Sequence, residues 1–180
     1  MERKLITRTT KLFCQAMFYR IVSPTLNKLV KGDLTEVQLS CLRFVNLHPE
    51  PSVGAVAEGL SFSNAASAKL IDRLVKKKLL IREEDQQDRR VLKIKLTVEG
   101  RELLTEIESI EAQQFATIMD RMKHEELEAL TTGLTAFLKA ALQDVSQLEE
   151  ICLRCGRDHL ADCPGNLLYR EFTGKDKENV

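Results

Sequence analysis

Residues 52–96 constrain the fold of this chain more than any other stretch, because three periodic patterns follow one another in them. Residues 52–60 and 63–81 have the apolar spacing of two short helices. Each begins with a serine, whose hydroxyl oxygen can accept a hydrogen bond from a free N–H of the first turn. Residues 91–96 then alternate apolar and basic side chains, the period of a half-buried strand. Two short helices followed by a hairpin predict a helix-turn-helix with a wing.

The second of these helices has two chemically different faces. Its apolar residues recur at helical spacing and should be buried: Ala66, Leu70, Ile71, Leu74 and Val75. The opposite face has small and hydrogen-bonding residues first and cations behind them: Asn64, Ala65, Ala68, Lys69, Arg73 and Lys76. Such a face suits the DNA major groove, where asparagine can pair with adenine and alanine can contact a thymine methyl group. We expect Asn64, Ala65 and Ser67 at base edges beside the capping Ser63; the alternative for Ser67 is a position facing the core.

The predicted hairpin joins residues 82–85 to residues 91–96 and has two arginines, Arg89 and Arg90, at its tip. Arginine on a thin wing can enter a narrow A·T-rich minor groove, where the negative potential is strongest. Asp88 beside them can hold a guanidinium group in one orientation. Cations on the helix and the second strand are expected to neutralise phosphates: Lys69, Arg73, Lys76, Lys77 and Lys93.

Several of these pieces together resemble the winged helix of the MarR family of transcriptional regulators: Leu34-Thr35, Ser63 to Leu74, Lys77 to Arg82, Asp88-Arg89-Arg90 and Leu96-Thr97-x-x-Gly100. The resemblance covers residues 5–150 in pattern and is specific over residues 34–104. It implies a DNA-binding dimer in which Asp88 orients Arg90. The family usually has glycine where this chain has Lys78. Lys78 must therefore adopt the left-handed conformation of a helix-ending glycine, or the helix must end differently.

The distribution of charge, rather than its sum, points to a nucleic acid. The chain has 27 basic and 27 acidic residues, so net charge says nothing about a partner. Cations dominate between Lys69 and Lys95, however, and acids dominate from Glu99 to Glu150. A basic face is the electrostatic footprint of a nucleic-acid binder, although charge runs more often form a solvated helix face. Their coincidence with the helix-turn-helix favours DNA.

Long amphipathic segments flank the winged stretch. Residues 2–31 have helical apolar spacing, interrupted at Ser23-Pro24 by a kink or a new helix start. The sequence predicts two more long helices, one capped by Thr97 and running from Val98 to about Asp120, the other from His124 to about Glu150. A lobe this small cannot cover three such apolar faces, so we expect a two-fold dimer of interleaved terminal helices. Two reading helices about one DNA turn apart would then bind a pseudo-palindromic operator.

The predicted fold is therefore mainly α with a small β-wing. We divide it into an N-terminal dimerisation helix (1–31), a winged helix-turn-helix DNA-binding domain (32–97), C-terminal dimerisation helices (98–150) and a Cys/His cluster with a tail (151–180). Within the second part, Thr35 and Gln38 form a predicted capping box. The helix that they open should run to about Leu47 and bury five residues: Val37, Leu39, Cys41, Leu42 and Val45.

The C-terminal segment contains the pattern C-x2-C-x3-H-x3-C. Its four sulfur and nitrogen donors, in number and type, suit tetrahedral Zn²⁺: Cys152, Cys155, His159 and Cys163. The spacing after the first pair is tighter than in common zinc fingers. An iron–sulfur cluster, a redox thiol switch and a metal-free tail therefore remain as alternatives. The other two cysteines, Cys14 and Cys41, lie in apolar helical patterns and are expected in the core.

The leading interpretation is a dimeric, sequence-specific DNA-binding transcriptional regulator, and the resemblance implies a response to a small ligand or a redox or metal signal. The alternative is a winged module that binds protein. An enzyme is disfavoured, because the sequence has no nucleophile paired with a base, no phosphate-binding glycine loop and no paired carboxylates in a loop. With no signal peptide and no membrane-spanning run, we expect a cytoplasmic protein.

Overall fold

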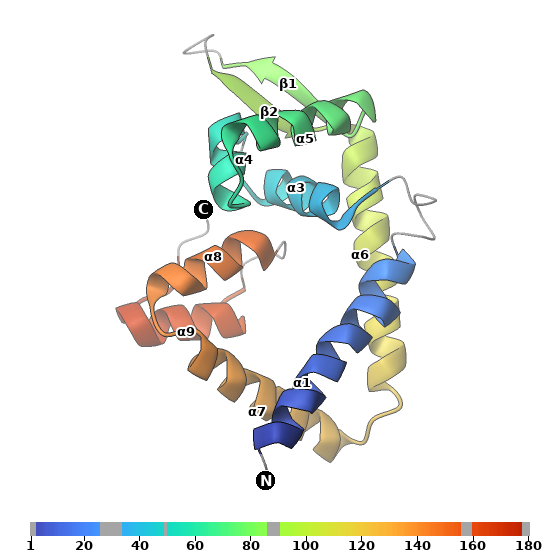
Figure 1. The fold of residues 1–180 in the computed structure, drawn as a ribbon, viewed down its shortest axis with the longest axis vertical. Helices are drawn as coiled ribbons and strands as arrows, with labels where there is room; N and C mark the ends of the chain where they lie inside the picture. The colour runs from blue at the N-terminus through green and yellow to red at the C-terminus, as the bar shows by residue number, and fades with distance from the viewer. Residues whose placement is uncertain (1–2, 26–33, 49, 86–90, 156–159, 178–180) are drawn as a thin grey trace.

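The computed structural model describes residues 3–25, 34–48, 50–85, 91–155 and 160–177 (Figure 1). A winged lobe consists of α3 (Glu36–Leu47), α4 (Val53–Gly59), α5 (Asn64–Lys76), β1 (Leu80–Glu84) and β2 (Leu92–Leu96). An arm consists of α1 (Arg3–Met17), the π-helix η1 (Phe18–Val22), α6 (Val98–Met119) and α7 (His124–Ala141). A C-terminal hairpin of α8 (Val145–Cys155) and α9 (Pro164–Thr173) returns to the side of the lobe formed by α3 and α4.

Hydroxyl groups begin four helices where the sequence predicts them. Thr35 accepts a hydrogen bond from the Gln38 N–H at 3.3 Å, and the Gln38 side chain accepts one from the Thr35 N–H at 3.1 Å, which completes the capping box. Ser52 and Ser63 cap α4 and α5, at 3.1 Å and 3.2 Å. Thr97 caps α6 at 2.9 Å. These caps are confirmed because each is a contact between residues three positions apart.

The core of the winged lobe joins α3, α4 and α5 to the two strands and the start of α6. β1 and β2 pair antiparallel, with Leu80 opposite Leu96. Three residues expected inside are exposed instead: Val37, Ala66 and Leu92. Each lies at the start of its element, in the first turn of α3 or α5 or at the first position of β2, where periodicity alone does not decide burial.

Lys78 adopts the left-handed conformation, with φ 59°. The chain leaves α5 through a Schellman motif, in which the Leu79 N–H donates to the Leu74 carbonyl at 3.0 Å and the Lys78 N–H donates to the Val75 carbonyl at 2.9 Å. The strained residue lets β1 begin at Leu80, two residues earlier than predicted. Close packing follows, since a Cβ on Gly100 would lie 2.2 Å from the Leu79 carbonyl oxygen.

The first long helix does not end at Pro24. The chain is α-helical to Met17, widens into the π-helix η1 and remains helical through residues 23–25; residues 26–31 of the prediction lie outside the described ranges. The Ser23 N–H donates to the carbonyl of Phe18, five residues back. A proline ring clashes with the carbonyl four residues before it, here that of Arg20, and a widened turn relieves this crowding.

The predicted helix from His124 to about Glu150 is wrong in its middle. It is two helices, α7 and α8, separated at residues 142–144. Asp144 accepts a hydrogen bond from the Gln147 N–H at 2.9 Å, and the Gln147 side chain accepts one from the Gln143 N–H at 3.0 Å. This D-x-x-Q pattern marks the start of a helix. It lies within a run of apolar residues whose helical spacing continues on both sides of it. α8 then runs past Glu150 and contains Cys152 and Cys155.

The arm exposes large apolar side chains. No residue of α1 is buried, and Leu12 is 70% exposed. Cys14, expected in the core, is exposed, whereas burial raises the pKa of the Cys41 thiol to about 12. On α7, Phe137 is 54% exposed.

Among the helices that the structure describes, none is both long and apolar enough to cross a membrane.

Candidate nucleic-acid interface

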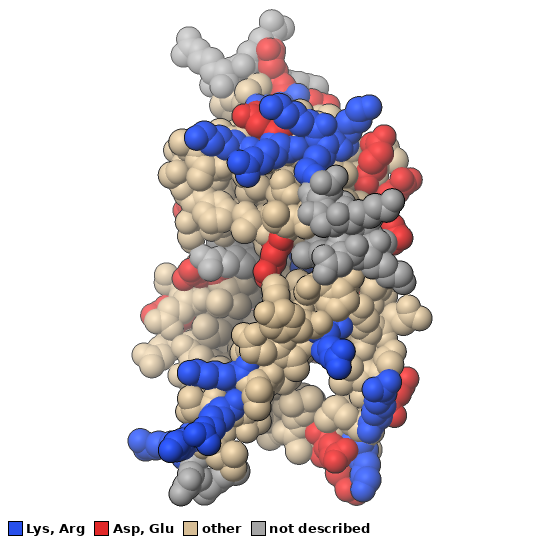
Figure 2. Space-filling view, turned by 45° about the vertical axis from the view of Figure 1, so that its right-hand side comes forward, with Lys and Arg blue, Asp and Glu red and all other residues tan. Residues whose placement is uncertain are grey.

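α5 lies on the outside of the winged lobe with its apolar face on the core. Leu70, Ile71 and Leu74 are buried, whereas the residues predicted to read DNA lie along the exposed face: Ser63, Asn64, Ala65, Lys69, Arg73 and Lys76. Figure 2 shows Lys and Arg side chains gathered in a band across the lobe. The helix therefore presents small polar residues at its N-terminal end and cations towards its C-terminal end, as the sequence predicts.

Ser67 is the exception on this helix. Its side chain is fully buried beside the core, and its Oγ atom has no hydrogen-bond partner among the residues described. It lies three and four residues before Leu70 and Ile71, so it shares their face. Ser67 is therefore not placed at a base edge, and the alternative position, facing the core, is the one that the structure shows.

An ion pair fixes the wing against α5. The Arg82 Nη1 atom on β1 donates to Asp72 Oδ1 at 2.6 Å, and Nη2 donates to the Ala68 carbonyl at 3.3 Å. Both partners lie on α5, so one guanidinium group sets the orientation of the strand relative to the reading helix. Sequence reasoning missed this contact, because Asp72 and Arg82 are ten residues apart and belong to different elements.

The lysines of β2 are held by carboxylates. Lys93 pairs with Asp85 at 2.7 Å and with Glu50 at 3.6 Å, and Lys95 pairs with Glu50 and Glu83, each at 2.8 Å. The hydrogen bond that Lys93 donates to Asp85 raises the pKa of Lys93, and the one that Lys95 donates to Glu50 lowers the pKa of Glu50. Two carboxylates therefore already engage the Lys93 ammonium group. The predicted wing-tip residues Asp88, Arg89 and Arg90 lie outside the described ranges.

Two thiols of the C-terminal cluster lie beside Gly165. A Cβ added there would lie 3.2 Å from Cys152 Sγ and 3.7 Å from Cys163 Sγ, while Cys155 is exposed. Burial raises the pKa of the Cys152 thiol. No group of three or more His, Cys, Asp or Glu side chains suited to a metal occurs within the described part of the chain, and His159 lies outside it.

Asn166, a buried residue that sequence reasoning missed, organises the same hairpin. Its Nδ2 atom donates to the Ala161 carbonyl at 3.0 Å and to Asp176 Oδ1 at 2.7 Å, and its Oδ1 atom accepts from the Lys177 N–H at 2.9 Å. Arg170 Nε also donates to Asp176, at 2.9 Å. These bonds hold the chain before α9 and the chain after it together.

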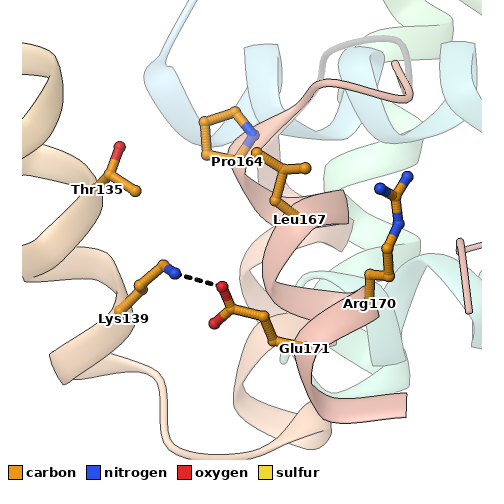
Figure 3. A pocket seen from close by; sticks show the side chains of 6 residues that line it. All are labelled: Thr135, Lys139, Pro164, Leu167, Arg170 and Glu171. Atoms are coloured by element: carbon orange, nitrogen blue, oxygen red, sulfur yellow. Dashed lines mark hydrogen bonds and ion pairs between the residues drawn. The ribbon is translucent and has the colours of Figure 1, made fainter. Parts of the chain in front are cut away.

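A pocket lies between α7 of the arm and α9 of the hairpin (Figure 3). Thr135 and Lys139 line it from α7, and the rest of its lining comes from α9: Pro164, Leu167, Arg170 and Glu171. Lys139 and Glu171 form an ion pair across it. This ion pair joins α7 to α9.

The fold and the basic exposed helix define a winged helix-turn-helix protein. Residues 32–91 match the model of the MarR family. The HTH-type transcriptional repressor MdtR of Bacillus subtilis is 33% identical over 90 residues, which cover 50% of this chain and 58% of the repressor. The chain thus spans little more than half the length of this curated relative.

Solved structures of the same fold cover more of the chain. The YusO protein of Bacillus subtilis has a TM-score of 0.63 and 27% identity, covering 79% of this chain and 100% of its own. MepR, a transcription regulator of the Staphylococcus aureus multidrug efflux pump MepA, has a TM-score of 0.63 and 23% identity over the same shares. A MepR mutant bound to an oligodeoxyribonucleotide has a TM-score of 0.56 and 25% identity, covering 74% and 98%. MepR has also been solved bound to ethidium bromide.

Proposed function

We propose that this protein is a cytoplasmic, sequence-specific DNA-binding transcriptional regulator of the MarR type. One observation carries the proposal: α5 is capped by Ser63, packed on the core by one face, and exposes Asn64, Ala65 and three cations on the other. The likeness to a transcriptional repressor and to a protein solved with an oligodeoxyribonucleotide supports it.

The exposed residues of α5 divide into two roles. Asn64 and Ala65 contact base edges in the major groove, beside the capping hydroxyl of Ser63. Lys69, Arg73 and Lys76 neutralise phosphates, so they supply affinity that depends on salt rather than on sequence. At the wing tip, Arg90 enters the minor groove and Asp88 orients it, with Arg89 beside the phosphates.

The functional unit in this proposal is a homodimer on a pseudo-palindromic operator. The exposed apolar side chains of the arm support it, since α1 and α7 leave Leu12, Phe13 and Phe137 uncovered in a single chain. A second copy that interleaves the same helices would bury them and would place two α5 helices on one face of the duplex.

Salt-dependent binding to selected DNA tests the function. Duplex fragments are selected from a random pool, and the Kd for the selected operator is measured at several salt concentrations. Arg73→Ala should weaken binding to every sequence and reduce the salt slope by about one, because it removes one phosphate contact. Arg101→Ala, an exposed arginine on α6, is the matched control. Absence of duplex binding would favour the alternative, a winged protein-interaction module.

Regulation by a small-molecule effector is part of the proposal, supported by the solved complex of MepR with ethidium bromide.

We also propose that Cys152, Cys155, His159 and Cys163 hold one Zn²⁺ that closes the C-terminal hairpin, with an iron–sulfur cluster as the alternative. The support is the ligand spacing together with the position of the Cys152 and Cys163 thiols, both beside Gly165.

Metal analysis on untagged protein tests the zinc proposal. About one zinc per subunit is expected, lost in Cys155→Ser and retained in Cys14→Ser, the control at an exposed thiol of α1. A brown protein with visible absorption after anaerobic purification would identify an iron–sulfur cluster instead. Metal-free protein whose Cys152 and Cys155 are freely alkylated would contradict both.

A further inference from the structure

One ion pair joins the winged lobe to the arm at the point where they separate. The Arg43 Nη2 atom on α3 donates to the Glu111 Oε2 atom on α6 across 2.6 Å. The Glu111 side chain is only 6% exposed, and the Arg43 side chain is 20% exposed. Neither residue belongs to a motif visible in the sequence, and the reading surface on α5 does not include them.

The pair marks the end of the apolar contact between α6 and the lobe. The lobe's core includes Leu104 and Ile107 of α6, and Glu111 follows one helical turn later. Further along, the Thr25 hydroxyl donates to Gln114 Oε1 at 3.2 Å, which ties α6 to the helical segment after η1. Directional polar contacts thus replace apolar packing where α6 leaves the lobe and enters the arm.

A nearly buried ion pair restricts the angle between two elements more strictly than apolar packing does. Apolar contact is non-directional, whereas a bonded guanidinium and carboxylate hold one distance and one orientation. Removing Glu111 takes away the carboxylate that orients the Arg43 guanidinium. The angle between the lobe and α6 is therefore tied to this bond.

We propose that Arg43 and Glu111 are positioning residues that set the angle between lobe and arm, and through it the half-site spacing that the dimer accepts. The inference rests on the proposed DNA-binding dimer. α6 rises about 1.5 Å per residue, so Glu111 lies about 20 Å along the helix axis from Val98, where α6 leaves the wing. A small rotation at the ion pair therefore changes the separation of the two α5 helices appreciably.

The test compares operators that differ only in half-site spacing. The selected operator is remade with one base pair added to or removed from its centre, and Kd is measured for each at one salt concentration. Wild-type protein should prefer its selected spacing. In Glu111→Gln this preference should fall about five- to tenfold, the size of a modest coupling between sites, while affinity for a single half-site is unchanged.

Glu171→Gln is the matched control, because it removes the same charge from the exposed pair with Lys139. Should Glu111→Gln fail to fold, Arg43→Met/Glu111→Leu serves in its place, since exchanging both members of a buried pair for apolar residues is tolerated better than removing one. That double variant should also lose the spacing preference.

Three results would overturn the inference: unchanged spacing ratios in a folded variant, a double variant that also fails to fold, or wild-type binding that is indifferent to spacing. Failure of the wild-type protein to bind any duplex would instead overturn the proposed function, so the two failures are distinguishable.

Discussion

At the scale of single residues, conformational strain at Lys78 is the clearest departure from what local chemistry favours. A left-handed backbone costs a residue with a Cβ about 1–2 kcal/mol, and glycine adopts it without that cost. Lys78 nevertheless has φ 59°, because the Schellman bonds of Leu79 and Lys78 and the pairing of β1 all require it. Packing of the whole lobe therefore stabilises a conformation that lysine by itself disfavours.

Replacing Lys78 with glycine should stabilise the protein. We expect Lys78→Gly to raise the free energy of unfolding by about 1 kcal/mol, since relief of strain outweighs the extra entropy of glycine in the unfolded chain. Lys77→Gly is the control: Lys77 is right-handed, with φ −78°, so glycine there should cost about 0.5–1 kcal/mol. Urea denaturation followed by circular dichroism measures both. Equal destabilisation by the two substitutions would contradict the strain argument.

At the scale of elements, ion pairs join the wing to α5. The Arg82 guanidinium joins β1 to Asp72 and Ala68 of α5, and carboxylates occupy Lys93 and Lys95 along β2. These ion pairs join β1 to α5 and β2 to β1. Because carboxylates already engage them, the lysines of β2 are less available to DNA than those of α5. Any contribution of the wing to binding is expected mainly from its tip.

Removing the arginine at the wing tip should weaken the affinity for the operator about tenfold. Arg90→Ala removes a guanidinium from the minor groove, and a single lost contact of this kind costs about 1–3 kcal/mol. Asp88→Ala should weaken binding in the same direction, because it releases the arginine. Fluorescence anisotropy on operators with A·T-rich and G·C-rich flanks measures the effect, which should be larger with A·T-rich flanks. Unchanged affinity in both variants would end the minor-groove hypothesis.

At the scale of the whole molecule, the arm is the part that a single chain leaves unfinished. α1 and α7 extend away from the lobe with large apolar side chains exposed, while the C-terminal hairpin packs back against α3 and α4 (Figure 1). The lobe has a core of its own, whereas the arm does not cover its apolar faces. In the proposed function, a second copy of the chain covers these faces.

Sedimentation should show a stable dimer at micromolar concentration. The double substitution Leu12→Glu/Phe137→Glu puts two charges on the exposed apolar faces and should shift the protein to monomer, because burying an unpaired carboxylate costs several kcal/mol. Val98→Glu is the control, at an equally exposed apolar residue in the first turn of α6, where an acid suits the helix dipole. A monomeric wild-type protein would contradict the dimer.

Local chemistry made much of this fold predictable from the sequence. Thr35, Ser52, Ser63 and Thr97 begin helices through bonds to residues three positions on, and the reading face of α5 follows from helical periodicity. The D-x-x-Q start at Asp144 is equally local, and the continuous apolar period around it hid the break between α7 and α8.

What the tertiary structure alone decided depends on partners distant in sequence. Arg43 meets Glu111 across 68 residues, and Arg82 meets Asp72 across 10. The structure also decided two questions that the sequence left open: Ser67 faces the core, and Lys78 is left-handed. Periodicity and capping are properties of a few adjacent residues, whereas burial, ion pairing and strain are settled only when the free energy of the whole packed lobe is minimised.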